Sequence, residues 1–100
     1  MAQVVWSPRA LRDIETIRDH IGQDNWTAAA KVLRGITGSV KRLETFPLSG
    51  REIHHRRARG AREIIRRPYR IAYDVQGDTI RVLRVHHGAQ DVDWATLADD

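Results

Sequence analysis

The chain has 100 residues and a mass of 11.5 kDa, which is enough for one hydrophobic core and too little for two. Its 41% apolar and 30% charged residues are typical of a folded domain, and its lack of cysteine excludes disulfides and thiolate metal sites. No apolar run approaches the roughly 20 residues that cross a bilayer, and the chain does not open on an apolar signal segment. We therefore expect a single soluble, cytoplasmic domain over residues 1–100, with no membrane association and no metal or cofactor.

Positive charge is concentrated in one part of the chain. Residues 51–70 contain eight arginines and two glutamates, a net charge of +6, whereas residues 91–100 carry four aspartates and no basic residue. A cluster of one sign attracts polyanions or an acidic protein. Only Lys31 and Lys41 among the 17 basic residues are not arginine, the side chain suited to bidentate contacts with phosphate or carboxylate. The block therefore predicts a binding surface for a negatively charged macromolecule.

The first half of the chain predicts one strand followed by two helices. Residues 3–6 form a short apolar run, and Ser7-Pro8 is typical of a helix N-cap and first helical residue. Apolar residues at spacings of three and four predict a helix over residues 8–21, which Gly22 ends. A second stripe predicts a helix from Asp24 or Asn25 to residues 46–47. Joined by so few residues, the two helices are expected to form an antiparallel hairpin.

The second half predicts three strands after a surface loop. Residues 48–60 have no periodicity, which favours a loop, and a turn at residues 76–78 joins the last two of the strands 61–66, 68–75 and 79–87. Residues 91–97 predict one or two turns of helix carrying Trp94, within a short acidic tail over residues 91–100. This order predicts an α+β domain, in which the helical hairpin packs on one face of a small, twisted, mainly antiparallel sheet.

Alternation along the strands predicts which side chains share a face of the sheet. Tyr69, Ile71 and Tyr73 share one face, so if they pack beneath the helices, Arg70 projects from the opposite, open face. The same alternation predicts that one face of the last strand carries Ile80, Val82, Arg84 and His86.

Six motifs in this order resemble one known superfamily. They comprise the order of elements, the opening Trp6-Ser-Pro-Arg-Ala-Leu-Arg-Asp-Ile-Glu, and the segments at residues 46–51, 62–65, 68–73 and 80–88. Over residues 3–90 the chain resembles the RelE/ParE superfamily, the toxins of bacterial type II toxin–antitoxin modules, also called plasmid-stabilisation proteins. The resemblance implies a small toxin that a cognate antitoxin neutralises by wrapping a flexible segment around it in a hetero-oligomeric complex.

The superfamily has two branches with different targets. ParE-like members inhibit DNA gyrase, whereas RelE-like members are mRNA endonucleases, or mRNA interferases, that act in the ribosome without a metal. His87-Gly88 at the end of the last strand favours the ParE-like branch. We therefore expect a gyrase inhibitor, with mRNA cleavage in the ribosome as the alternative. A plain RNA- or DNA-binding module is a third reading of the arginine cluster, but the sheet lacks the aromatic triplet that stacks bases.

Motif matching gives a partial nuclease site. Arg70 matches the arginine of the family's Tyr-Arg pair, and Arg62 matches a basic residue on the preceding strand if one gap is allowed. Three other positions of the family's nuclease site do not match. Its second basic residue on the preceding strand falls on Glu63 or Ile64, its arginine after the last strand falls near Gly88, and its C-terminal tyrosine falls near Trp94. If the chain is a nuclease, the expected catalytic residues are Arg70 and Arg62 as cations and His87 as acid or base. His86 points to the opposite face, so at most one of the two histidines acts in the site.

The remaining arginines are assigned to binding. If Arg62 and Arg70 do not act in catalysis, they pair with Glu63 or Asp74, and such exposed pairs add little stability. We assign the surface that binds the target or the antitoxin to Arg51, Arg56, Arg57, Arg59, Arg66, Arg67, Arg84 and Trp94.

Overall fold

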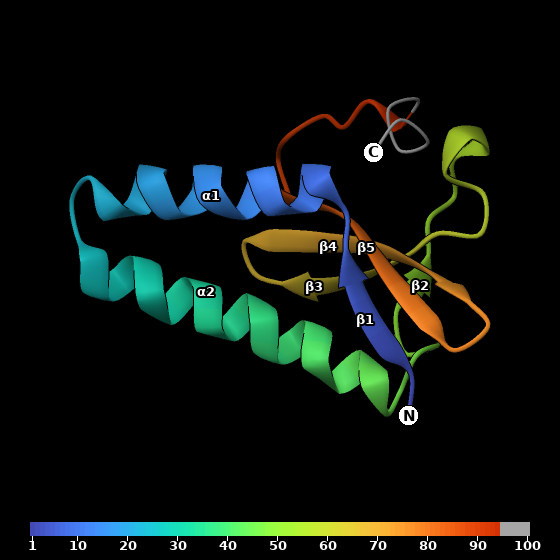
Figure 1. Ribbon diagram of the computed structural model, residues 1–100. Coiled ribbons are helices and arrows are strands. Elements are labelled where there is room, and N and C mark those ends of the chain that lie inside the picture. Colours follow the sequence, from blue (N-terminus) through green and yellow to red (C-terminus); the bar gives the residue numbers. More distant parts are fainter. Residues whose placement is uncertain (95–100) are drawn as a thin grey trace.

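A helical hairpin covers one face of a five-stranded sheet in the computed structural model, which describes residues 1–94 (Figure 1). The strands lie in the order β1-β5-β4-β3-β2, with β1 parallel to β5 and every other pair antiparallel. This confirms the α+β fold. The elements are β1 (Gln3–Trp6), α1 (Pro8–Gly22), α2 (Trp26–Lys41), β2 (Arg51–Glu52), β3 (Arg62–Arg66), β4 (Tyr69–Gln76) and β5 (Thr79–His87), with short 3-10 helices η1 (Arg42–Glu44) and η2 (Arg56–Ala58).

Side-chain caps start both helices where the sequence predicts them. The Ser7 hydroxyl accepts from the Ala10 amide at 3.0 Å and donates to the Leu83 carbonyl at 3.1 Å, which ties the start of α1 to β5. The Asn25 side chain accepts from the Ala28 amide at 3.0 Å and caps α2. The second helix ends earlier than expected, because the chain tightens into η1 after Lys41. No helix within residues 1–94 is both long and apolar enough to span a membrane.

The main core lies between the helices and the sheet. Ile71, Val82 and Val85 from the sheet pack with Ala10, Ile17, Ile36 and Val40 from the helices. Tyr73 is fully buried beside Leu43 and Ile80. The prediction that Ile71 and Tyr73 face the helices is therefore confirmed.

A β-bulge in β5 corrects the predicted faces of the last strand. Tyr73 pairs with Val82 but Ala72 pairs with Arg84, so Leu83 is the extra residue. Val85 thus joins Val82 in the core against the helices, while Leu83 contacts the other face. The prediction that His86 shares a face with Ile80 and Val82 is wrong, because one inserted residue reverses the alternation.

The face opposite the helices is only partly open, which also differs from the prediction. The segment between β2 and β3 folds over it, so that Ala58 and Ala61 pack on Ala72 and Leu83, with Ile53 and Trp94 at the margin of this second cluster. The predicted helix over residues 91–97 lies partly outside the described residues, and residues 91–93 have no regular secondary structure.

Candidate functional site

Arg70 lies on the face away from the helices and is held by a carboxylate. Its Nη1 lies 2.9 Å from Oε1 of Glu63 on the neighbouring strand, and Nη2 of Arg51 lies 2.7 Å from the same oxygen. The Glu63 side chain is 8% exposed, whereas those of Arg70 and Arg51 are 36% and 59% exposed. The position predicted for Arg70 is confirmed, and so is its alternative pairing with Glu63.

Arg62 and His87 lie on the other face of the sheet. In the strand register Arg62 is opposite Tyr73 and His87 is opposite Tyr69, both of which pack toward the helices. Arg62 donates to the Gly50 carbonyl at 2.8 Å and lies 3.8 Å from Glu52. The His87 ring meets the Tyr69 ring edge-on, with 5.9 Å between centroids. The structure therefore does not bring the three predicted catalytic residues together.

The histidine that lies beside Arg70 is His86. It pairs with Arg70 in the strand register and is 5% exposed. Its Nδ1 lies 3.0 Å from the His87 carbonyl oxygen, and its buried Nε2 has no hydrogen-bond partner among residues 1–94. Burial lowers the pKa of His86, which keeps the ring neutral at physiological pH. His86 and Arg70 thus share a shallow hollow of about 480 Å³, which Trp94, His55 and Glu63 also line.

Gly88 follows β5 at a place where a side chain would be in tight contact with its neighbours. Its amide donates to the Pro68 carbonyl at 2.7 Å, and a Cβ atom at this position would lie 3.2 Å from that oxygen and 3.4 Å from Arg70 Nε. The His87-Gly88 motif therefore has a local packing reason.

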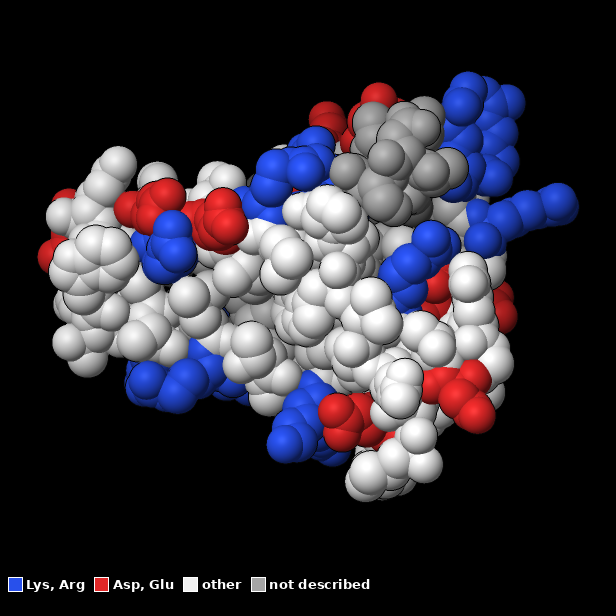
Figure 2. All heavy atoms as spheres, viewed as in Figure 1, with Lys and Arg blue, Asp and Glu red and all other residues white. Residues whose placement is uncertain are grey.

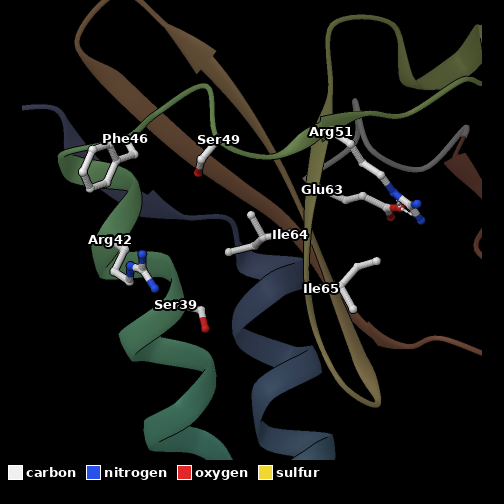
Figure 3. Close-up of a pocket in the computed structure, with 8 residues that line it drawn as sticks. All are labelled: Ser39, Arg42, Phe46, Ser49, Arg51, Glu63, Ile64 and Ile65. Atoms are coloured by element: carbon white, nitrogen blue, oxygen red, sulfur yellow. Dashed lines mark hydrogen bonds and ion pairs between the residues drawn. The ribbon is translucent and has the colours of Figure 1, made fainter.

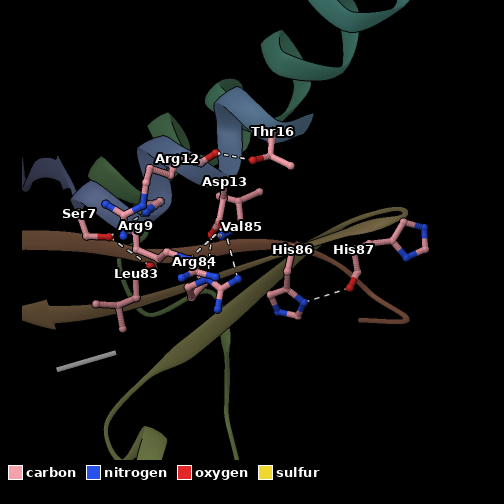
Figure 4. Close-up of polar contacts among 11 residues, drawn as sticks. Ser7, Arg9, Arg12, Asp13, Thr16, Leu83, Arg84, Val85, His86 and His87 are labelled. Carbon is pink, nitrogen blue, oxygen red and sulfur yellow. Dashed lines mark hydrogen bonds and ion pairs between the residues drawn. The ribbon is translucent and has the colours of Figure 1, made fainter. Parts of the chain in front are cut away.

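Arg84 is not available for binding, contrary to the prediction. It is 3% exposed, and its Nε and Nη2 lie 2.8 and 3.3 Å from the carboxylate oxygens of Asp13 on α1 (Figure 4). Oδ2 of Asp13 also accepts from the Val85 amide at 2.9 Å. Arg84 therefore joins the first helix to the sheet.

The remaining arginines of the predicted binding surface lie in two groups, at opposite ends of β3. Arg56, Arg57 and Arg59 are exposed on the segment before β3. Arg66 and Arg67 are exposed at the opposite end of β3, where the Arg66 guanidinium lies so close to Gly35 of α2 that a Cβ there would be 2.8 Å from it. Trp94 packs against the rings of His55 and His86, with centroids 6.4 and 6.1 Å apart.

A groove lies between α2 and β3, and no pattern in the sequence predicted it. It measures about 580 Å³ and is lined by Ser39, Arg42, Phe46, Ser49, Arg51, Glu63, Ile64 and Ile65 (Figure 3). Phe46 is 57% and Ile65 44% exposed, so two large apolar side chains that line this groove are open to solvent. Because β2 pairs only with Arg62 and Glu63, the rest of β3 has no neighbouring strand on this side within residues 1–94.

Among the described residues no group of three or more histidine, aspartate or glutamate side chains lies close enough to hold a metal ion.

Comparisons with known proteins agree with this fold. Residues 4–92 match the family described as "ParE toxin of type II toxin-antitoxin system, parDE". The chain is 35% identical over 91 residues to Toxin RelE2 of Caulobacter vibrioides, covering 90% of this chain and 99% of that protein. It is similar to a solved structure of a chromosomal ParDE toxin–antitoxin system from P. aeruginosa, with a TM-score of 0.74 and 26% identity over 87% of this chain and 96% of that one. The toxin–antitoxin complex RelBE2 from Mycobacterium tuberculosis is also similar, with a TM-score of 0.61 and 25% identity over 86% and 96% of the two chains.

Proposed function

Because the chain belongs to the family of ParE toxins of type II toxin–antitoxin systems, we propose that it binds and inhibits DNA gyrase, in the cytoplasm. The observation that carries this choice over mRNA cleavage is the separation of Arg62 and His87 from Arg70 on opposite faces of the sheet. The relatives' names do not choose between the two targets, since both ParE and RelE occur among them.

Cleavage by a ribose hydroxyl needs several groups at one phosphate. A base must take the proton, cations must stabilise the phosphorane charge, and an acid must protonate the leaving oxygen. Arg70 is the one residue of the predicted trio on the face away from the helices, and Glu63 already compensates its charge. Inhibition by binding needs no such constellation, only an accessible surface.

The gyrase proposal is tested with purified protein. Added to gyrase, relaxed plasmid and ATP, the chain is expected to block supercoiling and to leave cleaved DNA bound to the enzyme. In cells, its induction is expected to raise the DNA damage response while translation continues. Prompt arrest of translation, with mRNA cut in the ribosomal A site and gyrase unaffected, would show that the proposal is wrong.

Neutralisation by an antitoxin is the second part of the proposal. The groove beside β3 is lined by the apolar side chains of Phe46 and Ile65 and by the basic side chains of Arg42 and Arg51. Beyond Glu63, the edge of β3 at this groove pairs with no other strand within residues 1–94. An extended antitoxin segment with apolar and acidic side chains is expected to pair with that edge, since added strands gain backbone hydrogen bonds and side-chain pockets together. The two solved structures compared above are toxin–antitoxin systems, which supports a partner of this kind.

One observation keeps mRNA cleavage as the second candidate. If His86 Nδ1–H donates to the His87 carbonyl, then Nε2 carries the lone pair that a general base requires. The His86 side chain lines the hollow that Arg70 also lines. In that case His86→Gln is expected to abolish mRNA cleavage and His87→Gln to leave it intact. Under the gyrase proposal no cleavage is seen with any of the proteins.

A further inference from the structure

Three arginines project from the segment between β2 and β3. Arg56 and Arg57 belong to η2 and Arg59 follows it, and all three are exposed. Within residues 1–94 none of their guanidinium groups forms an ion pair or a side-chain hydrogen bond, in contrast to Arg51, Arg70 and Arg81. Figure 2 shows basic side chains gathered where this segment projects from the molecule, in the region of η2 in Figure 1. We call residues 54–59 the basic loop.

The backbone of the basic loop is held in place from below. Ala58 and Ala61, 2% and 3% exposed, are buried against the sheet. The amides of Ala58 and Ala61 donate to the carbonyls of His55 and Ala58, each at 2.9 Å, and His55 Nδ1 accepts from the Arg57 amide at 3.1 Å. The loop is therefore ordered before binding, and a ligand has to immobilise only the ends of the arginine side chains.

We propose that the basic loop binds the phosphate backbone of duplex DNA. Arginine forms bidentate hydrogen bonds with phosphate oxygens, and the loop presents three unpaired guanidinium groups beside a hollow of about 440 Å³ that His54, His55 and Arg56 help to line. Binding to phosphates needs charge alone and is independent of sequence.

The composition of the loop separates DNA from the other polyanions. An acidic protein would need apolar contacts at the centre of its interface, yet the apolar side chain of the loop, Ala58, is buried. Single-stranded nucleic acid would need an exposed aromatic ring on which bases stack. Trp94, the nearby indole, is partly buried and packs on His55 and His86. The phosphate backbone of a duplex can bind the arginines of the loop without apolar contacts and without an aromatic ring for stacking. This inference goes beyond the action on gyrase and does not depend on it.

The test compares two variants of the full chain that lose the same charge. One is the triple variant Arg56→Ala, Arg57→Ala and Arg59→Ala. The control is Lys31→Ala, Arg34→Ala and Lys41→Ala, which removes three exposed basic residues of α2. Binding of a short fluorescein-labelled DNA duplex of arbitrary sequence is followed by fluorescence anisotropy over a series of salt concentrations, with circular dichroism to compare folding.

We expect the native chain and the control to bind with similar affinity and salt dependence. Each lost phosphate contact removes about 0.9 from the slope of log K against log salt, so the loop variant is expected to have a slope shallower by about 2.7 and to bind at least about tenfold more weakly. If the loop variant binds DNA as the control does, the proposal is overturned. It is also overturned if poly-glutamate or single-stranded DNA binds the native chain more tightly than the duplex does, because the loop then serves another partner.

Discussion

Arg84 of β5 and Asp13 of α1 form an ion pair beneath the surface, with Nε 2.8 Å from Oδ2. Their side chains are 3% and 11% exposed, and the Val85 amide donates to the same carboxylate. Strand β1 pairs with β5 only as far as Val82. The Asp13 carboxylate therefore accepts hydrogen bonds from a part of β5 that has no β1 residue beside it. The pair therefore fixes the first helix against the sheet at the place where strand pairing stops.

Removing Asp13 is expected to destabilise the fold strongly. Asp13→Ala leaves the buried Arg84 charge without its partner, and loss of one member of a buried pair costs about 3 to 5 kcal/mol. Urea denaturation followed by circular dichroism measures the change. The control is Asp19→Ala, which breaks the exposed pair with Arg18 and is expected to cost less than about 1 kcal/mol. Equal effects of the two variants would show that the buried pair has no special role.

Tyr73 is expected to stabilise the segment before β2 through its hydroxyl. The hydroxyl donates to the Pro47 carbonyl and accepts from the Gly50 amide, each at 2.8 Å, on a fully buried side chain. Tyr73→Phe leaves both backbone groups unsatisfied and is expected to lower the free energy of unfolding by about 1 to 3 kcal/mol. Tyr69→Phe is the matched control, because the Tyr69 hydroxyl has no hydrogen bond with any residue that the structure describes. A loss as large in Tyr69→Phe would contradict this account.

His86 is expected to make stability fall at acidic pH. Burial lowers its pKa in the folded chain below the ordinary value of 6.5, so the unfolded chain binds the proton more readily. Stability is therefore fully present above about pH 6.5 and declines as the pH falls toward the folded pKa, by up to about 1.4 kcal/mol per pH unit. The measurement is the free energy of unfolding of the native chain and of His86→Gln over this range. The same acid dependence in the variant would assign the effect to other groups.

Two glycines are expected to respond to alanine in opposite directions. At Gly38, inside α2, a Cβ atom meets nothing within 4 Å, so Gly38→Ala is expected to stabilise the chain by up to about 1 kcal/mol. At Gly50 a Cβ atom would lie 2.6 Å from the Tyr73 ring and 2.8 Å from the Glu63 carbonyl oxygen. Gly50→Ala is therefore expected to destabilise it by about 1 to 3 kcal/mol. Thermal unfolding of the two variants checks the sign of each effect.

The groove beside β3 is expected to hold the antitoxin. Phe46→Ser removes an exposed apolar side chain that lines the groove, so weaker binding to a cognate antitoxin is expected with little change in folding stability. Isothermal titration calorimetry measures the affinity. Trp26→Ser removes an exposed aromatic side chain at the far end of α2, and this variant is expected to keep the native affinity for the antitoxin. An antitoxin that binds the two variants equally well occupies another surface.

The elements could be predicted from the sequence because their signals are local. Ser7-Pro8 and Asn25 start the helices through hydrogen bonds that span three residues, and Gly77, with a φ of 58°, closes the hairpin between β4 and β5. The alternation that buries Ile71 and Tyr73 and turns Arg70 away lies within eight consecutive residues. For these residues the neighbours in the sequence determine where each helix begins and which side chains share a face of the strand.

The composition of the candidate site was decided by contacts between distant parts of the chain. Whether Arg62 shares a face with Arg70 depends on the register of two strands, and whether His86 or His87 does depends on one bulged residue, Leu83. The partner of Arg84 lies 71 residues away on α1. A shift of one position in pairing reverses every side chain that follows it, so only the folded sheet determines which of these groups lie together.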